Sequence, residues 1–319
     1  PPHNLNEVVE ALIAIVKKPS LDEEKLLEII PGPDFPTGGE ILISNGIKET
    51  YTKGRGSITM RGIAHIEEIN PGKGKHKRSG IIITELPYQL NKASWIEKLA
   101  ELVNNGKVSG IADIRDESDR DGMRILVEIK RDSNPEKILD FLYQKTSLQS
   151  NFGAILLALV NGQPVQLTLR KLLDNFLEFR EKTILLRSHY LLKNIRNRQE
   201  IVEALIQAIN NLRNIINLIE KSKDTAEAKN NLINSLNINE RQADGILGMP
   251  LKKITSLEKN SLKNEIKDLK NKRDELELII NNREKLMQLM VKELKELKKR
   301  FGSDRKTKLI EGGDALIAE

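Results

Sequence analysis

The chain has 319 residues, of which 31% are charged and 39% hydrophobic, and this length predicts two or three structural units. Its longest apolar run, residues 152–160, is about half of what a bilayer span requires, which excludes a transmembrane helix and predicts no membrane partner. The absence of cysteine excludes a disulfide scaffold and thiolate zinc sites, and it predicts a reducing, cytoplasmic compartment. Since the chain opens on Pro1 and not on methionine, we expect a piece of a longer protein.

The first half of the chain follows the pattern of a mixed α+β fold. Residues 1–30 form a helical connector with amphipathic helices predicted over 6–17 and 21–30, and a loop rich in proline and glycine follows at 31–40. Four alternating segments read as strands and two amphipathic segments as helices. The predicted strands are 40–43, 57–69, 80–86 and 124–130, and the helices are 92–105 and 134–143. Residues 31–165 therefore predict one compact α+β domain.

The second half is predicted to be a long antiparallel two-helix coiled coil with a small helical knob. The outgoing arm spans 166–221, the knob 222–261, the returning arm 262–301 and a tail 302–319. The returning arm keeps a heptad spacing without interruption from Leu262 to Phe301, which predicts one continuous helix. Short amphipathic helices are predicted in the knob at 226–236 and 240–247.

The net charge of +6 is concentrated between residues 48 and 78, where eight basic and three acidic side chains occur. We expect seven of the basic residues to contact the phosphates of double-stranded DNA without reading its sequence, with a solvated loop as the alternative. These are Lys53, Arg55, Arg61, Lys73, Lys75, Lys77 and Arg78. The last four belong to a run, residues 71–80, that reads as an exposed hairpin loop.

Two other features of the sequence, a segment similar to a calcium-binding loop and the four histidines, do not indicate a functional site. Residues 117–122 come close to a calcium-binding loop, but a strand-like segment follows where a helix is required. The four histidines lie at unrelated positions, so the sequence predicts no metal site and no catalytic set.

Several long phrases occur in a fixed order. They are IPGPDFPTGGEI at 30–41, GRGS at 54–57, TELPYQLNKA at 84–93, IRDESDRDGMRI at 114–125, LQSNFG at 148–153 and ALVNGQP at 158–164. Through them the chain resembles, over about residues 1–305, the A subunit of bacterial type IIA DNA topoisomerases, which are DNA gyrase and topoisomerase IV. The resemblance implies a tower-like domain beside the DNA, coiled-coil arms, and a knob that forms the dimeric exit gate.

The resemblance also implies a function, namely ATP-dependent strand passage that controls DNA supercoiling. The complete enzyme would use Mg²⁺ and ATP through a B-type partner subunit in an A2B2 complex, and we expect no cofactor in this chain. In the family a preceding winged-helix domain carries the catalytic tyrosine within an Arg-Tyr-Thr sequence. Because none of the tyrosines at 51, 88, 143 and 190 lies in such a sequence, we expect the chain alone to be inactive.

The knob is predicted to join two copies of the chain. Its helices are too short to be stable alone, so we expect a homodimer through residues 221–261. The apolar residues assigned to this contact are Leu232, Leu236, Ile246, Leu247 and Met249. A different class stays open, a structural coiled-coil spacer of chromosome organisation without topoisomerase activity, which would have no reason to contain the basic region.

Overall fold

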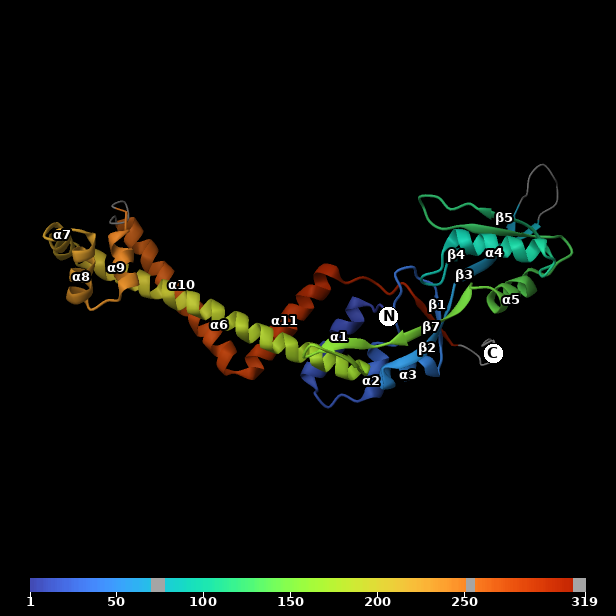
Figure 1. The fold of residues 1–319 in the computed structure, drawn as a ribbon, viewed down its shortest axis with the longest axis horizontal. Coiled ribbons are helices and arrows are strands. Elements are labelled where there is room, and N and C mark those ends of the chain that lie inside the picture. The colour runs from blue at the N-terminus through green and yellow to red at the C-terminus, as the bar shows by residue number, and fades with distance from the viewer. Residues whose placement is uncertain (70–77, 251–255, 312–319) are drawn as a thin grey trace. The chain divides into compact units, whose positions relative to one another are not determined.

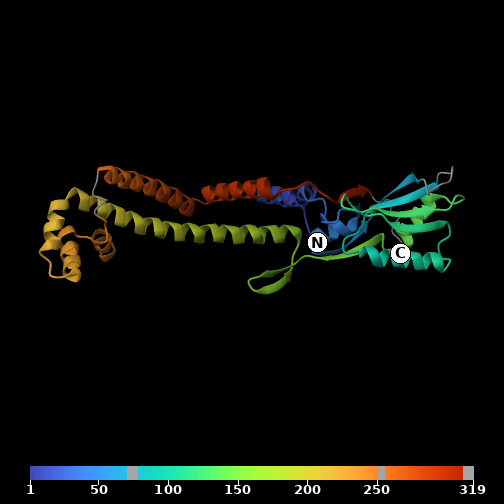
Figure 2. The same cartoon turned by 90° about the horizontal axis from the view of Figure 1, so that it is seen from above.

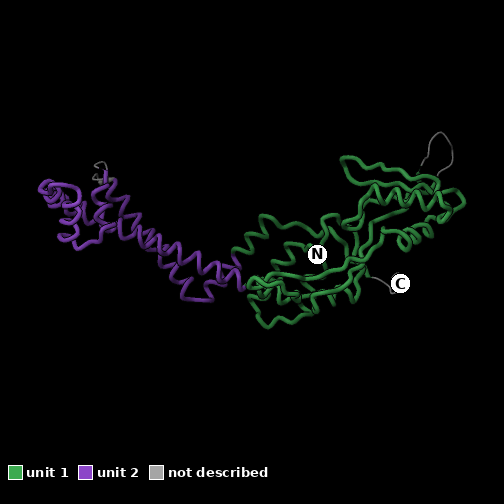
Figure 3. The backbone as a smooth tube through the Cα atoms, in the orientation of Figure 1, with its two compact units in different colours: residues 1–177, 293–319 green, residues 178–292 purple. Residues whose placement is uncertain are grey.

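The computed structural model describes residues 1–69, 78–250 and 256–311 (Figure 1). The chain divides into two compact units. Unit 1 contains residues 1–177 and 293–319, and unit 2 contains residues 178–292 (Figure 3). Unit 2 is therefore inserted in the sequence between two pieces of unit 1. No helix in the described part of the chain is long and apolar enough to cross a membrane.

Unit 1 begins with two short helices, as the sequence predicts. α1 spans Leu5–Lys17 and α2 spans Glu23–Ile29. The side chain of Asn4 accepts hydrogen bonds from two backbone N–H groups at the start of α1, and Asp22 does the same for one N–H of α2. These caps fix where both helices begin.

The first sheet combines distant parts of the chain in the order β10-β1-β2-β7. Its strands are β1 (Glu40–Ile43), β2 (Arg55–Arg61), β7 (Gln149–Ile155) and β10 (Lys308–Glu311), and α3 (Asn45–Lys53) connects β1 to β2. β10 pairs with β1 in parallel, while the other pairs are antiparallel. The apolar spacing predicts neither α3 nor β7 nor β10, and β10 lies in the segment assigned to the tail.

The expectation of a single strand over residues 57–69 is wrong, because the chain passes from one sheet to the next at Gly62. β2 ends at Arg61, and β3 (Ile63–Ile69) belongs to the second sheet. The N–H of Gly62 donates to the carbonyl of Leu148 over 2.8 Å. A Cβ at this position would lie 2.7 Å from the Leu148 side chain and from the carbonyl oxygen of Glu85, so only glycine fits without a shift.

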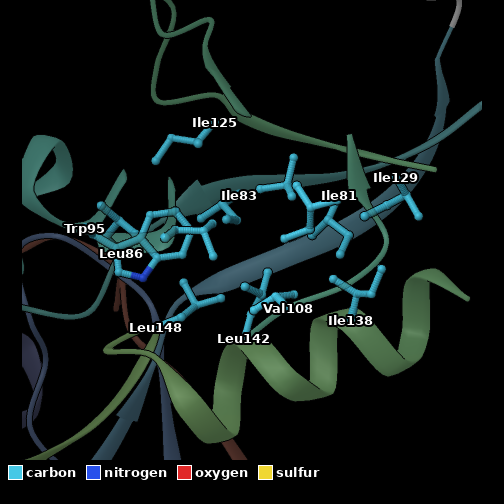
Figure 4. Packing of buried hydrophobic residues seen from close by; sticks show 13 residues of the cluster. Ile81, Ile83, Leu86, Trp95, Val108, Ile125, Ile129, Ile138, Leu142 and Leu148 are labelled. Carbon is cyan, nitrogen blue, oxygen red and sulfur yellow. The ribbon is translucent and has the colours of Figure 1, made fainter. Parts of the chain in front are cut away.

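The second sheet is antiparallel, with the order β3-β4-β6-β5, and it carries a core of unit 1. β4 spans Arg78–Glu85, β5 Ile111–Asp116 and β6 Ile125–Ile129, while α4 spans Lys92–Asn104 and α5 Pro135–Lys145. The predicted strands at 80–86 and 124–130 and both predicted helices are thereby confirmed. Figure 4 shows aliphatic residues of β4 and β6 packed against Trp95 and Leu142, which come from the two helices.

Two further strands, β8 (Leu157–Val160) and β9 (Gln163–Gln166), form a separate two-stranded antiparallel hairpin just before α6. Asn161 and Gly162 make its turn, both with positive φ. This Asn-Gly pair is the signature of a tight hairpin turn, although no strand was expected in this segment.

Unit 2 consists of helices joined by short connections in its described residues. Its helices are α6 (Leu169–Asn210), α7 (Leu212–Glu220), α8 (Thr225–Leu236), α9 (Glu240–Leu247), α10 (Ser256–Asn281) and α11 (Arg283–Phe301), of which α6 and α11 extend into unit 1. Ion pairs join Glu181 to Arg283 over 2.8 Å and Arg198 to Glu265 over 2.7 Å. The order of these pairs shows that the outgoing and returning helices run antiparallel (Figure 2).

The prediction of one continuous returning helix is wrong, because the helix breaks at Asn282. The side-chain oxygen of Asn282 accepts hydrogen bonds from the N–H groups of Glu284 and Lys285, so it starts a new helix, α11. The outgoing segment also breaks, at Asn211 between α6 and α7, although the Asn211 side chain makes no capping hydrogen bond. Heptad spacing records only apolar positions, and it carries no signal for a capping asparagine between them.

Candidate nucleic-acid interface

Four of the seven predicted DNA contacts lie in the described part of the chain. Lys53 ends α3, Arg55 and Arg61 begin and end β2, and Arg78 begins β4. Lys73, Lys75 and Lys77 lie outside the described residues.

β2 presents a row of polar side chains on one face of the first sheet. Arg55, Ser57, Thr59 and Arg61 stand at alternate positions of the strand, so they point to the same side. The neighbouring strand β7 places Asn151 opposite Thr59 and Gln149 opposite Arg61. The Thr59 hydroxyl donates to the Asn151 side-chain oxygen over 2.8 Å. Thr59 itself is buried, so the accessible part of this face consists of the exposed Arg55, Ser57 and Asn151 and the half-buried Arg61 and Gln149. Hydroxyl, amide and guanidinium groups of this kind usually contact phosphate and sugar.

Arg61 is held in a fixed orientation within this face. Its Nε and Nη2 donate to the side-chain oxygen of Gln149 over 3.0 and 2.7 Å, and its guanidinium lies 4.3 Å from the ring centroid of Tyr143. Tyr143 in turn donates to the carbonyl of Gly62, and burial raises the pKa of its phenol to about 12. Tyr143 therefore stays protonated at neutral pH, and its ring packs against the Arg61 guanidinium.

Lys53 and Arg55 are more exposed than Arg61. The Lys53 ammonium forms an ion pair with Glu49, one turn earlier in α3, over 2.8 Å, and 69% of the Lys53 side chain is exposed. Because an exposed pair of this kind contributes little free energy, Lys53 can exchange Glu49 for a phosphate. A hollow of about 670 Å³ opens between the start of α3 and β2. Neither Lys53 nor Arg55 lines it, and its polar lining includes Ser44, Lys48, Glu49, Ser57, Thr59 and Asn151.

Sequence reasoning found the arginines of this face but missed its hydroxyl and amide groups. The signal was present in the alternation Arg-x-Ser-x-Thr-x-Arg over residues 55–61. The partners on β7 could not be found in this way, because strand pairing over about ninety residues leaves no local trace.

The expectation that Arg78 lies in an exposed hairpin loop is wrong. Arg78 is the first residue of β4, and its guanidinium forms an ion pair with Glu128 of β6. Arg115 of β5 binds the other carboxylate oxygen of Glu128 over 3.1 Å. Since the Glu128 side chain is only 7% exposed, the two arginines compensate a buried charge. Arg78 therefore has a structural task, and its contact with DNA stays a prediction.

Two of the tyrosines are engaged in packing. The Tyr51 hydroxyl lies 2.8 Å from Nε2 of His3, and burial raises the pKa of Tyr51 above its usual range. Burial also lowers the pKa of His3 to about 4, with a further contribution from Arg305, so neutral His3 accepts a hydrogen bond from the Tyr51 hydroxyl. Neither Tyr51 nor Tyr143 is free to attack a phosphate. Among the described residues, no group of three or more histidine or acidic side chains could hold a metal ion.

Comparison with known proteins decides the family. The family model for the A subunit of DNA gyrase/topoisomerase IV matches residues 1–295, which is most of the chain. The chain belongs to this family.

Relatives that match the chain over nearly its whole length carry the same two family names. The chain is 49% identical to the A subunit of DNA topoisomerase 4 and 47% identical to the A subunit of DNA gyrase, both from Synechocystis sp., with 99% of the chain covered in each case. Over all 319 of its residues, the chain is 42% identical to part of the DNA gyrase A subunit of Halalkalibacterium halodurans. These matches cover 35%, 37% and 38% of the relatives, so the chain spans little more than a third of the gyrase and topoisomerase IV subunits it matches.

In this member of the gyrase and topoisomerase IV family, the residues predicted for the dimer contact pack within their own chain. Leu232 and Ile246 are buried in the core of unit 2, and Leu236, Leu247 and Met249 pack against that core while keeping part of their surface exposed. Leu232 and Ile246 are therefore buried without a second copy of the chain. The sequence-based argument, that the short knob helices need a second copy to be stable, does not apply to these two residues. A contact between copies through the other three stays a prediction.

Proposed function

We propose that this chain is the part of a type IIA topoisomerase A subunit that supports the cleaved duplex and forms the exit gate. In this proposal unit 1 is the tower-like domain beside the DNA. The antiparallel helices of unit 2 are coiled-coil arms, and residues 221–261 join two copies. Membership of the family of gyrase and topoisomerase IV A subunits supports the proposal. The observation that carries it is the polar face of β2, from Arg55 to Arg61.

This face suits a duplex bound through its backbone. Two arginines stand at its ends, about 20 Å apart for a strand of this length, and hydroxyl and amide groups lie between them. The rise of B-DNA between successive phosphates of one strand is about 3.4 Å, so the row can follow several phosphates. Contacts to phosphate and sugar position a duplex but carry no sequence information, so binding through this row should depend on charge and hardly on sequence.

The proposal predicts how duplex binding changes when basic residues are removed. Lys53→Gln with Arg55→Gln should lower the slope of log affinity against log salt by about 2, since each lost phosphate contact removes about 0.9. The affinity should fall equally for duplexes of unrelated sequence, as measured by fluorescence anisotropy at several salt concentrations. Arg131→Gln, an exposed arginine in the loop after β6, is the matched control and should leave the slope unchanged. An unchanged slope in the double variant would contradict the proposal.

The chemical step is assigned to other parts of the complete enzyme. We infer an A2B2 complex in the bacterial cytoplasm, in which a B-type subunit supplies Mg²⁺ and ATP and a winged-helix segment supplies the catalytic tyrosine. The chain alone should then leave supercoiled plasmid intact. Mixed with a winged-helix polypeptide and the B-type subunit, it should support magnesium-dependent cleavage, and a mixture that never cleaves would count against the assignment.

The exit gate is proposed at the end of unit 2. Sedimentation at micromolar concentration should give a dimer, and Leu236→Asp should convert it to a monomer because a charge would enter the contact. The neighbouring exposed residue supplies the control, Ser235→Asp, which should remain dimeric. A monomeric parent chain would refute this part of the proposal.

The family match does not favour the spacer hypothesis. A spacer without topoisomerase activity would also dimerise, so the cleavage experiment and not the sedimentation experiment separates the two.

A further inference from the structure

The hairpin of β8 and β9, called here the apolar hairpin, exposes aliphatic side chains on both of its faces. Ile155, which ends β7, and Leu157 and Leu159 of β8 stand at alternate positions and are 51%, 63% and 75% exposed. Val165 of β9, opposite Ala158, is 38% exposed. In Figure 2 the hairpin, drawn in yellow-green, stands apart from the two larger sheets of unit 1. Both of its faces are therefore available in this chain.

The base of the apolar hairpin is firmly attached to the rest of unit 1. Leu156 and Leu167 are buried, and the N–H of Leu156 donates to the carbonyl of Gly54 over 2.9 Å. The Gln166 side chain donates to the carbonyl of Lys53 over 2.9 Å. Gly54 has a φ of +77°, and a Cβ there would lie 2.4 Å from the Leu167 carbonyl, so the backbones approach as closely as glycine allows. The base of the apolar hairpin therefore has a fixed geometry, and the exposed residues extend from it.

A two-stranded hairpin is at best marginally stable in water by itself, because it lacks a second layer to bury its apolar face. Scattered aliphatic residues on a surface need no explanation, but here they gather on one small ribbon. This arrangement favours a surface that is covered in the working protein.

The charge pattern says what kind of surface covers it. From Thr146 to Leu169 the chain contains no charged side chain, although 31% of all residues are charged. A surface that binds nucleic acid needs lysine or arginine to neutralise phosphates, whereas the centre of a protein–protein contact is depleted of charge. The apolar hairpin therefore fits a protein surface and not the duplex proposed for the neighbouring face of β2.

We propose that the apolar hairpin is the docking site for another folded segment of the same polypeptide. The three relatives extend well beyond the region that this chain matches, which is 35% to 38% of their length. A segment of the same polypeptide is present at a high effective concentration, so a contact as small as this ribbon can remain closed. The inference goes beyond the proposed function, since it concerns neither the duplex nor the exit gate.

The chain contains no cysteine, so a single introduced thiol reports on this surface alone. Leu159→Cys in residues 1–319 should react with a maleimide about as fast as an exposed peptide thiol. In the longest polypeptide that the gene encodes, the same thiol should react at least about tenfold more slowly, as resolved by peptide mass spectrometry. The control is Asp132→Cys, at an exposed position of the loop after β6, which should react at equal rates in both proteins. Equal rates at position 159, or a gene that encodes nothing beyond residues 1–319, would overturn the proposal.

A photo-crosslinking residue at position 159 of the longer polypeptide identifies the occupant. The expected product is an internal crosslink to a peptide outside residues 1–319, without a doubling of the mass. Crosslinks to a second copy, or protection of the thiol in residues 1–319 that appears only when duplex DNA is added, would each assign the surface to a different partner and reject the proposal. Circular dichroism should show no change in Leu159→Cys, because the replaced side chain is mostly exposed.

Discussion

The buried pair of His3 and Tyr51 makes the stability of unit 1 depend on pH between the usual pKa of histidine and the lowered pKa of His3. In the folded chain the pKa of His3 is about 4, against a usual value of 6.5. Burial is the main cause of this low pKa, and of the charged side chains around His3, Arg305 lowers the pKa and Asp34 raises it. As the pH falls from 6.5 towards 4, the unfolded chain binds a proton at His3 and the folded chain does not.

Stability must therefore decrease as the pH falls through this range. At about 1.4 kcal/mol for each pH unit between the two pKa values, the free energy of unfolding should drop by about 3 kcal/mol. Trp95 is the single tryptophan, it is buried in unit 1, and its fluorescence reports the unfolding of that unit in urea.

The variant that isolates the effect of His3 is His3→Gln, because the glutamine side chain can still accept a hydrogen bond from the Tyr51 hydroxyl but does not titrate. Its stability should fall much less than that of the parent between pH 6.5 and 4.5. Below that range, carboxylates such as Glu67 and Asp116 affect both proteins alike, since their pKa values are lowered to about 2 by Arg124 and Lys92 and not by His3. If parent and variant lose stability in parallel throughout, His3 is not buried in its neutral form and the reasoning fails.

Two further substitutions test the cores of the two units separately. Arg78→Ala should lower the free energy of unfolding by about 1–3 kcal/mol, measured through Trp95 fluorescence, because it leaves the buried Glu128 less well compensated. Unchanged unfolding together with weaker duplex binding would return Arg78 to the role predicted from the sequence. Leu232→Ala removes a fully buried side chain from the core of unit 2 and should cost about 2–5 kcal/mol in the helical unfolding transition seen by circular dichroism. Ser235→Ala on the same helix should have almost no effect, and equal losses in both variants would contradict the packing described for Leu232.

Much of the fold could be predicted where the sequence signal is local. The helices from α1 to α5 other than α3, and the strands at 40–43, 80–86 and 124–130, follow from the spacing of apolar residues within short windows. The pairing of β10 with β1 could not be predicted, because it joins residues that are more than 260 positions apart. The breaks at Gly62 and Asn282 depend on a close backbone approach and on a side-chain cap, and apolar periodicity contains neither.

The candidate site was predicted in the same uneven way. Net charge pointed to Arg55 and Arg61, since basic residues are visible in composition alone. It also pointed to Arg78, whose buried partner Glu128 lies fifty positions away and becomes apparent only once β4 and β6 are paired. A count of charged residues cannot distinguish an arginine that is available to bind a phosphate from one that is already paired with a carboxylate.

The parallel pairing of β10 with β1 also determines how the polypeptide would respond to a cut. Residues 293–319 return to unit 1, where Arg305 binds Glu7 and the backbone N–H of Thr307 donates to Asp34. A protease that nicks the backbone within unit 2 therefore leaves two fragments that remain associated through unit 1. The long helical excursion can then be lengthened or shortened during evolution without releasing β10 from the sheet that it forms with β1.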